Sequence, residues 1–138
     1  MGDLERFRDA HRRDFAQAYF EIQNGYKETH WMWYIFPQIQ GLGRSSTAQY
    51  YAISDIEEAV EFLSDPYLGD NLRAISKELL SKSTNDAVDI FGYIDAMKLK
   101  SSMTLFALTS EDYTIFDEIL ECFFNGEMDE VTVKLING

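Results

Sequence analysis

Both tryptophans and one of the two histidines fall within four residues, at His30, Trp31 and Trp33. The His30 imidazole is the side chain of this segment that exchanges a proton near neutral pH. An indole stacks on flat rings, and its N–H needs a partner once buried. On a helix Trp31 and Trp33 point about 160° apart, which places one in the core and the other towards a groove, with Gln38 close by. The alternative is that His30 caps the helix and both indoles are core residues.

The glycine-rich loop that follows has features suited to an anion. Gly41 and Gly43 let the backbone approach a ligand closely, and Arg44 offers a planar pair of donors for phosphate or carboxylate. Three hydroxyl residues then offer a cap for a helix to about residue 53, where backbone N–H groups favour anions: Ser45, Ser46 and Thr47. The pattern is neither a dinucleotide fingerprint nor a Walker loop. A tight turn followed by a helix cap explains it equally well.

A third group of polar residues lies in the apolar stretch 93–108. Asp95, Lys98 and Ser102 share one helical face, with Ser101 beside them, and we take all four as candidate site residues. Lys98 and Ser102, four residues apart, would also suit a nucleophilic Ser–Lys pair, so His30, Lys98 and Ser102 are the candidate catalytic residues. The alternative is a surface ion pair between Asp95 and Lys98, worth about 0.3 kcal/mol.

Helical periodicity and capping signals divide the chain into successive helices and show few period-two segments. The expected helices cover about residues 4–26, 29–36 with Thr29 as cap, 45–53, 54–63, 65–81, 83–92, 93–108, 111–124 and 129–136. We therefore expect an all-α fold: a compact multi-helix bundle, residues 1–138 forming one domain. The helix at 93–108 should be its centre, because it has the least polar circumference.

The charge distribution limits the partners. The net charge is −12, and residues 1–50 are neutral, so the acidic excess lies wholly in residues 51–138. Such a surface repels the nucleic-acid backbone, whereas a small anion could still reach a local basic site. The longest apolar run, residues 31–36, is too short to span a bilayer. We expect a cytoplasmic protein with no membrane or nucleic-acid partner, no metal and no cofactor, since no residues have metal-ligand spacing.

Taken in order, the motifs resemble a known family. They are His30–Gln38, Gly41–Ser45, Tyr51–Ile53, Asp65–Gly69, Ile90–Gly92 and Lys98–Phe106. This succession is similar to domain-of-unknown-function family 1810, a set of small cytoplasmic proteins sometimes described as calpastatin-like. Calpastatin-type inhibitors are extended and disordered, whereas this composition is globular. The resemblance implies a mainly helical single domain and no particular reaction.

Two functions are consistent with these residues. In the first, the three segments converge on a site for a small anionic or nucleotide-like ligand, with binding alone or with hydrolysis or group transfer. In the second, the Trp-rich segment is a homodimer or partner interface, since Trp, Tyr and Arg are common interface anchors. A concave pocket lined by all three segments would favour the ligand, and a flat exposed aromatic surface would favour the interface.

Overall fold

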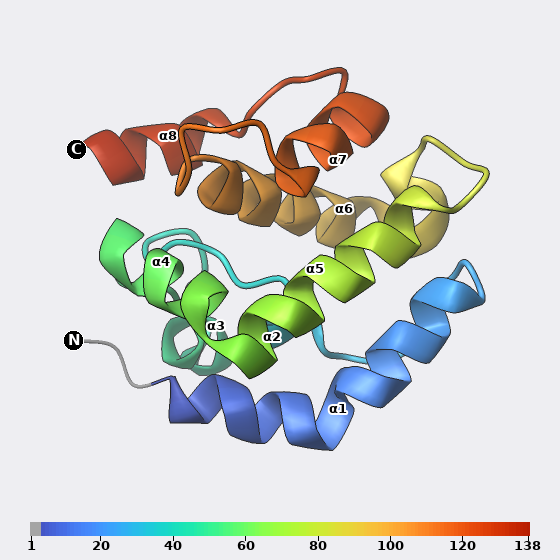
Figure 1. Ribbon diagram of the computed structural model, residues 1–138, viewed down its shortest axis with the longest axis horizontal. Helices are drawn as coiled ribbons and strands as arrows, with labels where there is room; N and C mark the ends of the chain where they lie inside the picture. The colour runs from blue at the N-terminus through green and yellow to red at the C-terminus, as the bar shows by residue number, and fades with distance from the viewer. Residues whose placement is uncertain (1–3) are drawn as a thin grey trace.

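The computed structural model describes residues 4–138, and in this range it contains eight helices and no strand, which confirms the all-α expectation. The helices are α1 (Glu5–Gln23), α2 (Met32–Ile35), α3 (Ser46–Tyr50), α4 (Ile56–Ser64), α5 (Pro66–Leu80), α6 (Ala87–Ala107), α7 (Ile115–Phe124) and α8 (Glu130–Asn137). Helices α1 and α5 pack together along one side of the molecule, and α7 and α8 cover the opposite side of α6 (Figure 1).

Helix α6 is the centre of the core, as its apolar circumference predicts. Every residue from 101 to 107 is buried, and the helix contacts α4, α7 and α8. The ring of Phe106 lies 5.5 Å from that of Phe62 on α4 and 5.7 Å from that of Phe116 on α7. Aromatic contacts of this kind add to the stabilisation that burial provides. Because α6 is held on several sides, its N-terminal half is a rigid support for polar side chains at the surface.

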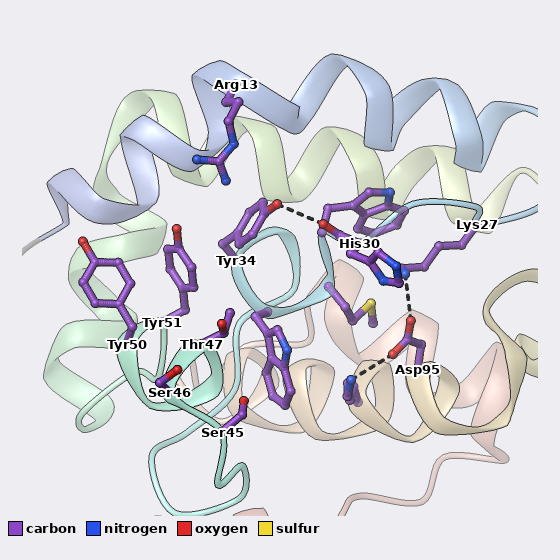
Figure 2. A pocket seen from close by; sticks show the side chains of 14 residues that line it. Arg13, Lys27, His30, Tyr34, Ser45, Ser46, Thr47, Tyr50, Tyr51 and Asp95 are labelled. Atoms are coloured by element: carbon purple, nitrogen blue, oxygen red, sulfur yellow. Dashed lines mark hydrogen bonds and ion pairs between the residues drawn. The ribbon is translucent and has the colours of Figure 1, made fainter.

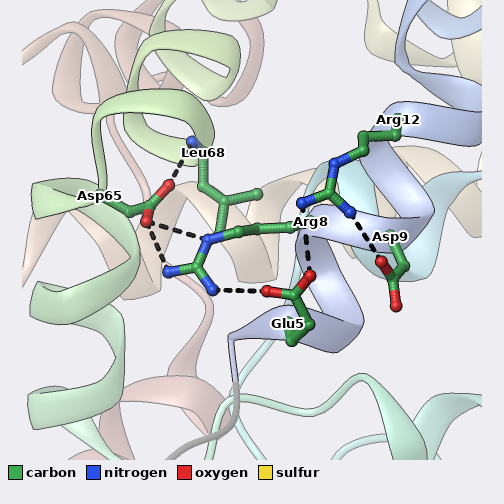
Figure 3. Close-up of polar contacts among 6 residues, drawn as sticks. All are labelled: Glu5, Arg8, Asp9, Arg12, Asp65 and Leu68. Atoms are coloured by element: carbon green, nitrogen blue, oxygen red, sulfur yellow. Dashed lines mark hydrogen bonds and ion pairs between the residues drawn. The ribbon is translucent and has the colours of Figure 1, made fainter.

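Aspartate caps set several helix starts where the sequence predicts them. Asp65 ends α4 and caps α5, accepting a hydrogen bond of 2.9 Å from the Leu68 N–H. The same carboxylate accepts a 2.7 Å contact from Arg8, which also pairs with Glu5 (Figure 3). One side chain therefore stabilises a helix terminus and attaches α1 to the α4–α5 junction.

Helix α6 bends at Gly92, which separates the two helices expected at 83–92 and 93–108. Asp86 caps the first part, and Gly92 has φ 77° and ψ 167° inside the helical segment. This conformation is almost confined to glycine. The bend redirects the chain so that residues 101–107 lie in the core, while residues 87–91 pack beside the Trp-rich segment, where the Phe91 ring lies 6.4 Å from that of Trp31.

The Gly92→Ala substitution is expected to lower the free energy of unfolding by about 1–3 kcal/mol, because an L side chain is strained in this conformation. Crowding is not the cause, since an added Cβ would meet no atom within 4 Å. Urea denaturation measures the effect. The control is Tyr93→Ala, which removes a side chain exposed to 69% and should change stability by less than about 0.5 kcal/mol. Equal effects of the two substitutions would show that Gly92 carries no strain.

Several helix boundaries differ from expectation by three or four residues. Helix α1 ends at Gln23 instead of residue 26, and the helix expected from residue 83 begins at Ala87. Helix α2 is confined to Met32–Ile35, and Thr29 does not cap it because its hydroxyl donates instead to the Glu21 carboxylate. Helix α3 is capped by Ser45 but ends at Tyr50, because the backbone of Ile53 pairs with Gln38 and Gln40 in an isolated parallel bridge. The helix expected from residue 111 begins at Ile115, where Thr114 and Asp117 form a capping box.

Candidate functional site

A cavity of about 790 Å³ opens between the middle of α1, the Trp-rich segment, α3 and the N-terminal half of α6 (Figure 2). Its size is in the range that small-molecule sites occupy. The lining residues are Arg13, Lys27, His30, Trp31, Met32, Trp33, Tyr34, Ser45, Ser46, Thr47, Tyr50, Tyr51, Asp95 and Lys98. Residues from all three segments singled out in the sequence therefore meet at one concave surface.

A buried carboxylate holds the Trp-rich segment in place. Glu21 of α1 has no exposed surface, and its oxygens accept hydrogen bonds from five donors. The donors are Gln17 Nε2 at 2.9 Å, Glu28 N at 2.8 Å, Thr29 N at 3.0 Å, Thr29 Oγ1 at 2.5 Å and Trp31 Nε1 at 2.9 Å. Burial raises the pKa of Glu21, but the hydrogen bonds from Thr29, Gln17 and Glu28 outweigh it and lower the pKa to about 2. The ionised carboxylate thus holds the backbone of residues 28–31 in position at the wall of the cavity.

The two indoles lie in different environments, although Trp31 precedes α2 and has non-helical dihedral angles of φ −145° and ψ 7°, so the 160° helical separation does not apply to it. Trp31 is 1% exposed and packs in the core near Phe36 and Phe91. Trp33 is half-buried and presents ring surface to the cavity. Gly43 makes this placement feasible, because a Cβ there would lie 3.1 Å from the Trp33 ring and 2.4 Å from the Ala48 Cβ. This glycine therefore accommodates an aromatic wall of the site.

Lys27, Asp95 and Lys98 form the lysine–aspartate cluster at one end of the cavity (Figure 2). The Lys27 Nζ lies 2.8 Å from one Asp95 oxygen, and the Lys98 Nζ lies 3.0 Å from the other. Burial raises the pKa of Asp95, but hydrogen bonds from the two lysines outweigh it and hold the pKa below its ordinary value. The ammonium groups also lie over aromatic rings: Lys98 is 4.2 Å from the Trp33 centroid, and Lys27 is 5.0 Å from that of Trp31. Asp95–Lys98 is thus part of a three-residue cluster rather than an isolated pair.

A second polar group, at the α1 end, is neutral. The Arg13 guanidinium lies 3.0 Å from Asp14 and 5.4 Å from the centroid of the Tyr34 ring. The Tyr34 hydroxyl donates to Asp14 and is 3.0 Å from the His30 carbonyl oxygen. Burial and the hydrogen bond with Asp14 raise the pKa of Tyr34 to about 12, so the phenol stays protonated at neutral pH. Hydrogen bonds with Tyr34 and Asp14 raise the pKa of Arg13.

The cavity includes seven of the candidate residues chosen from sequence. They are His30, Trp31, Trp33, Ser45, Ser46, Asp95 and Lys98. His30 is exposed at the opening, while the hydroxyl residues before and within α3 form the facing wall. His30 and Lys98 therefore share a site although 68 positions separate them in the chain.

Six other candidates lie outside the cavity lining: Gln38, Gly41, Gly43, Arg44, Ser101 and Ser102. Arg44 is exposed, and its carbonyl oxygen accepts from Gln49 at 2.9 Å. Ser101 donates to the Met97 carbonyl oxygen of its own helix, and Ser102 is fully buried, since α6 turns this face into the core. The pairing of Lys98 with Ser102 is therefore not available to a ligand in the cavity, and we withdraw Ser102 as a catalytic candidate.

The other three residues, Gln38, Gly41 and Gly43, pack against neighbouring parts of the fold. An added Cβ at Gly41 would lie 3.2 Å from Leu135 of α8, and Gly43 packs on Trp33. Gln38 is 6% exposed, and its Nε2 has no hydrogen-bond partner among the described residues. The backbone oxygen of Gln38 accepts a 2.8 Å hydrogen bond from Ile53. The loop 38–44 thus packs behind Trp33 and supports the aromatic wall of the cavity.

Sequence reasoning did not assign seven lining residues: Arg13, Lys27, Met32, Tyr34, Thr47, Tyr50 and Tyr51. Five of them lie inside or within two residues of motifs already recognised, so including every residue of each motif and its neighbours would have found them. Lys27 gives a weaker signal, as a lone cation just before the Trp-rich segment. Arg13 gives none, because it sits among other charged residues of α1 and only packing of α1 beside α2 brings it to the cavity.

The molecule is thus an acidic helical protein with an aromatic cavity that three cationic side chains line. The chain belongs to the family of proteins of unknown function DUF1810, whose model matches residues 1–136. This confirms the resemblance read from the motifs. It is also similar to a solved structure, the conserved hypothetical protein Rv1873 from Mycobacterium tuberculosis. The two share 37% identity with a TM-score of 0.95, over 99% of this chain and 97% of that one.

No curated protein matches the chain. None of the helices within residues 4–138 combines the length and apolar content that a bilayer span requires.

Proposed function

We propose that the cavity binds a small organic anion with a flat ring, a class that includes nucleotide-like ligands. The observation that carries the proposal is the charge of the lining. Three cationic side chains and one carboxylate line the cavity of a chain whose net charge is −12. Cations concentrated in a cleft of an otherwise acidic protein attract small anions and leave long polyanions facing a repulsive surface.

Each wall has a role in this proposal. The Trp33 ring stacks on the flat part of the ligand, with Tyr50 and Tyr51 at the other end of the aromatic surface. Lys27 and Lys98 attract the anionic group. The hydroxyl residues Ser45, Ser46 and Thr47 donate further hydrogen bonds to it.

His30 is the imidazole that lines the cavity, so it is the residue that would act as general acid or base towards a bound ligand. Binding alone accounts for the lining residues. In a hydrolase or transferase, His30 would in addition give a proton to the bound ligand or take one from it. We include such an activity in the proposal as an extension of binding.

The alternative is a protein-interaction module that uses the Trp-rich segment as a homodimer or partner interface. That function needs the indoles at the surface. Trp31 is 1% exposed and Trp33 lies in a concave wall, so the geometry supports the ligand better than the interface.

A thermal shift assay tests the proposal, with AMP and 1-naphthyl sulfate as ring-bearing anions and inorganic phosphate as an anion without a ring. A ring-bearing anion at a hundredfold its dissociation constant should stabilise the protein by about 2.7 kcal/mol, a rise of roughly 5–10 °C in Tm. The Lys98→Ala variant should lose most of the shift because it removes an ammonium group from the cavity. DNA and RNA should not bind at physiological salt.

The matched control is Arg44→Ala. It removes a nearby exposed cation that does not line the cavity, so its shift should equal that of the wild type. The proposal is wrong if no ring-bearing anion raises Tm, or if the shift survives Lys98→Ala and disappears in Arg44→Ala.

A further inference from the structure

The lysine–aspartate cluster carries a defined surplus of charge. Two ammonium groups face one carboxylate, at 2.8 and 3.0 Å, and the pKa of Asp95 lies below its ordinary value. The cluster therefore has a net charge of +1 at neutral pH. The Lys27 side chain is only 8% exposed and also donates to the Thr29 carbonyl oxygen at 2.7 Å, so this ammonium group is held in place.

The neighbouring charged groups leave this surplus unchanged. Arg13 is balanced by Asp14 at 3.0 Å. The Glu21 carboxylate keeps its charge but has no exposed surface and does not line the cavity, and its oxygens already accept five hydrogen bonds. Among the residues that line this end of the cavity, a ligand thus meets a surplus of one positive charge, which Lys27 and Lys98 carry on either side of Asp95.

We propose that the lysine–aspartate cluster makes the site selective for organic anions with a single negative charge, such as a sulfate ester, a carboxylate or a phosphodiester, over doubly charged phosphomonoesters. Asp95 is the specificity-determining residue. This inference rests on the proposed function, since it concerns the charge of the ligand bound in the same cavity.

The physical reason is charge balance. A singly charged anion neutralises the cluster, whereas the second charge of a phosphomonoester adds to an assembly that is already neutral and is repelled by Asp95. That second charge also loses hydration on entering the cleft. Two unit charges at about 4 Å interact by about 1 kcal/mol in water and by more near a protein, so the charge of Asp95 alone disfavours the second negative charge by about fivefold in affinity relative to a neutral residue at this position.

Two probes with the same ring isolate the charge: 1-naphthyl sulfate, a monoanion, and 1-naphthyl phosphate, a dianion at about pH 8 because its second pKa is near 6. Isothermal titration calorimetry should show the wild type binding the sulfate more tightly. Asp95→Asn keeps the side-chain shape and raises the surplus to +2. It should move the ratio of affinities towards the phosphate by at least about fivefold.

A second variant keeps the test independent of any local rearrangement. The double substitution Asp95→Asn with Lys98→Gln leaves Lys27 alone, returns the surplus to +1 and should restore the preference for the sulfate. The inference is overturned if the wild type binds the phosphate more tightly, or if Asp95→Asn leaves the ratio within about twofold; the proposed function survives either result. If neither probe binds the wild type, this inference fails, and the proposed function fails with it when AMP also leaves Tm unchanged.

Discussion

Replacing Glu21 by alanine is expected to lower the free energy of unfolding by about 4 kcal/mol. The substitution removes the acceptor for five donors, among them the N–H of the fully buried Trp31 indole. Each buried donor left without a partner costs about 1–3 kcal/mol, and hydrogen bonds to charged groups are the stronger ones. A loss of this size is a large part of the stability of a small domain. Urea denaturation followed by tryptophan fluorescence measures it.

Gln17→Ala is the matched control for this prediction. It deletes one of the five hydrogen bonds, at 2.9 Å, from an exposed side chain of the same helix. The expected loss is about 0.5–1 kcal/mol. The account of Glu21 as the anchor of the Trp-rich segment would be refuted by similar losses in both variants. Glu21→Ala should also weaken binding of the ring-bearing anions in the thermal shift assay, because Lys27 and His30 depend on that segment for their positions.

Acidification from about pH 6.5 to pH 4 is expected to remove about 3 kcal/mol of stability through His11 alone. This side chain is 1% exposed, with Nε2 at 2.9 Å from the Tyr34 carbonyl oxygen and Nδ1 at 3.1 Å from Asn71 Nδ2. Burial lowers its pKa from 6.5 to about 4, although the Tyr34 carbonyl opposes the shift. Between these values the unfolded chain binds a proton that the folded protein does not, so stability falls as the pH falls.

The measurement is the free energy of unfolding at several pH values for the wild type and for His11→Gln, which keeps hydrogen-bonding groups but does not titrate. The wild type should lose about 3 kcal/mol more than the variant over this window. Glu21, with a pKa of about 2, adds a further loss only below about pH 4.5, so it does not mask the His11 effect. Parallel curves for the two proteins would contradict the assignment.

Acid sensitivity of His11 also bears on the cavity. His11 contacts the backbone of Tyr34, and Tyr34 lines the cavity beside Arg13.

The sequence suggests a half-exposed structural histidine at this position, because His11 lies between alanine and two arginines. Its complete burial results from α1 packing on α2 and α5, which places Asn71 against the ring.

The sequence by itself determined the helical class and most helix starts. Asp65, Asp86 and Asp129 cap the helices where they are expected, and Gly92 separates the two parts of α6. These features depend on hydrogen bonds and backbone conformations within a few residues, and helical periodicity is equally local. Local chemistry is readable because the interacting groups are adjacent in the chain.

Only the tertiary structure decided which polar residues share the cavity. Lys27 meets Asp95 across 68 positions, Arg13 arrives from α1, and Arg44 and Ser102 lie elsewhere although their motifs suit an anion site. The partner of a charged side chain at that separation depends on how whole helices pack, and the apolar core sets this packing without reference to the polar residues on the helices. A motif therefore indicates the chemistry a residue can perform, and the fold determines where that chemistry takes place.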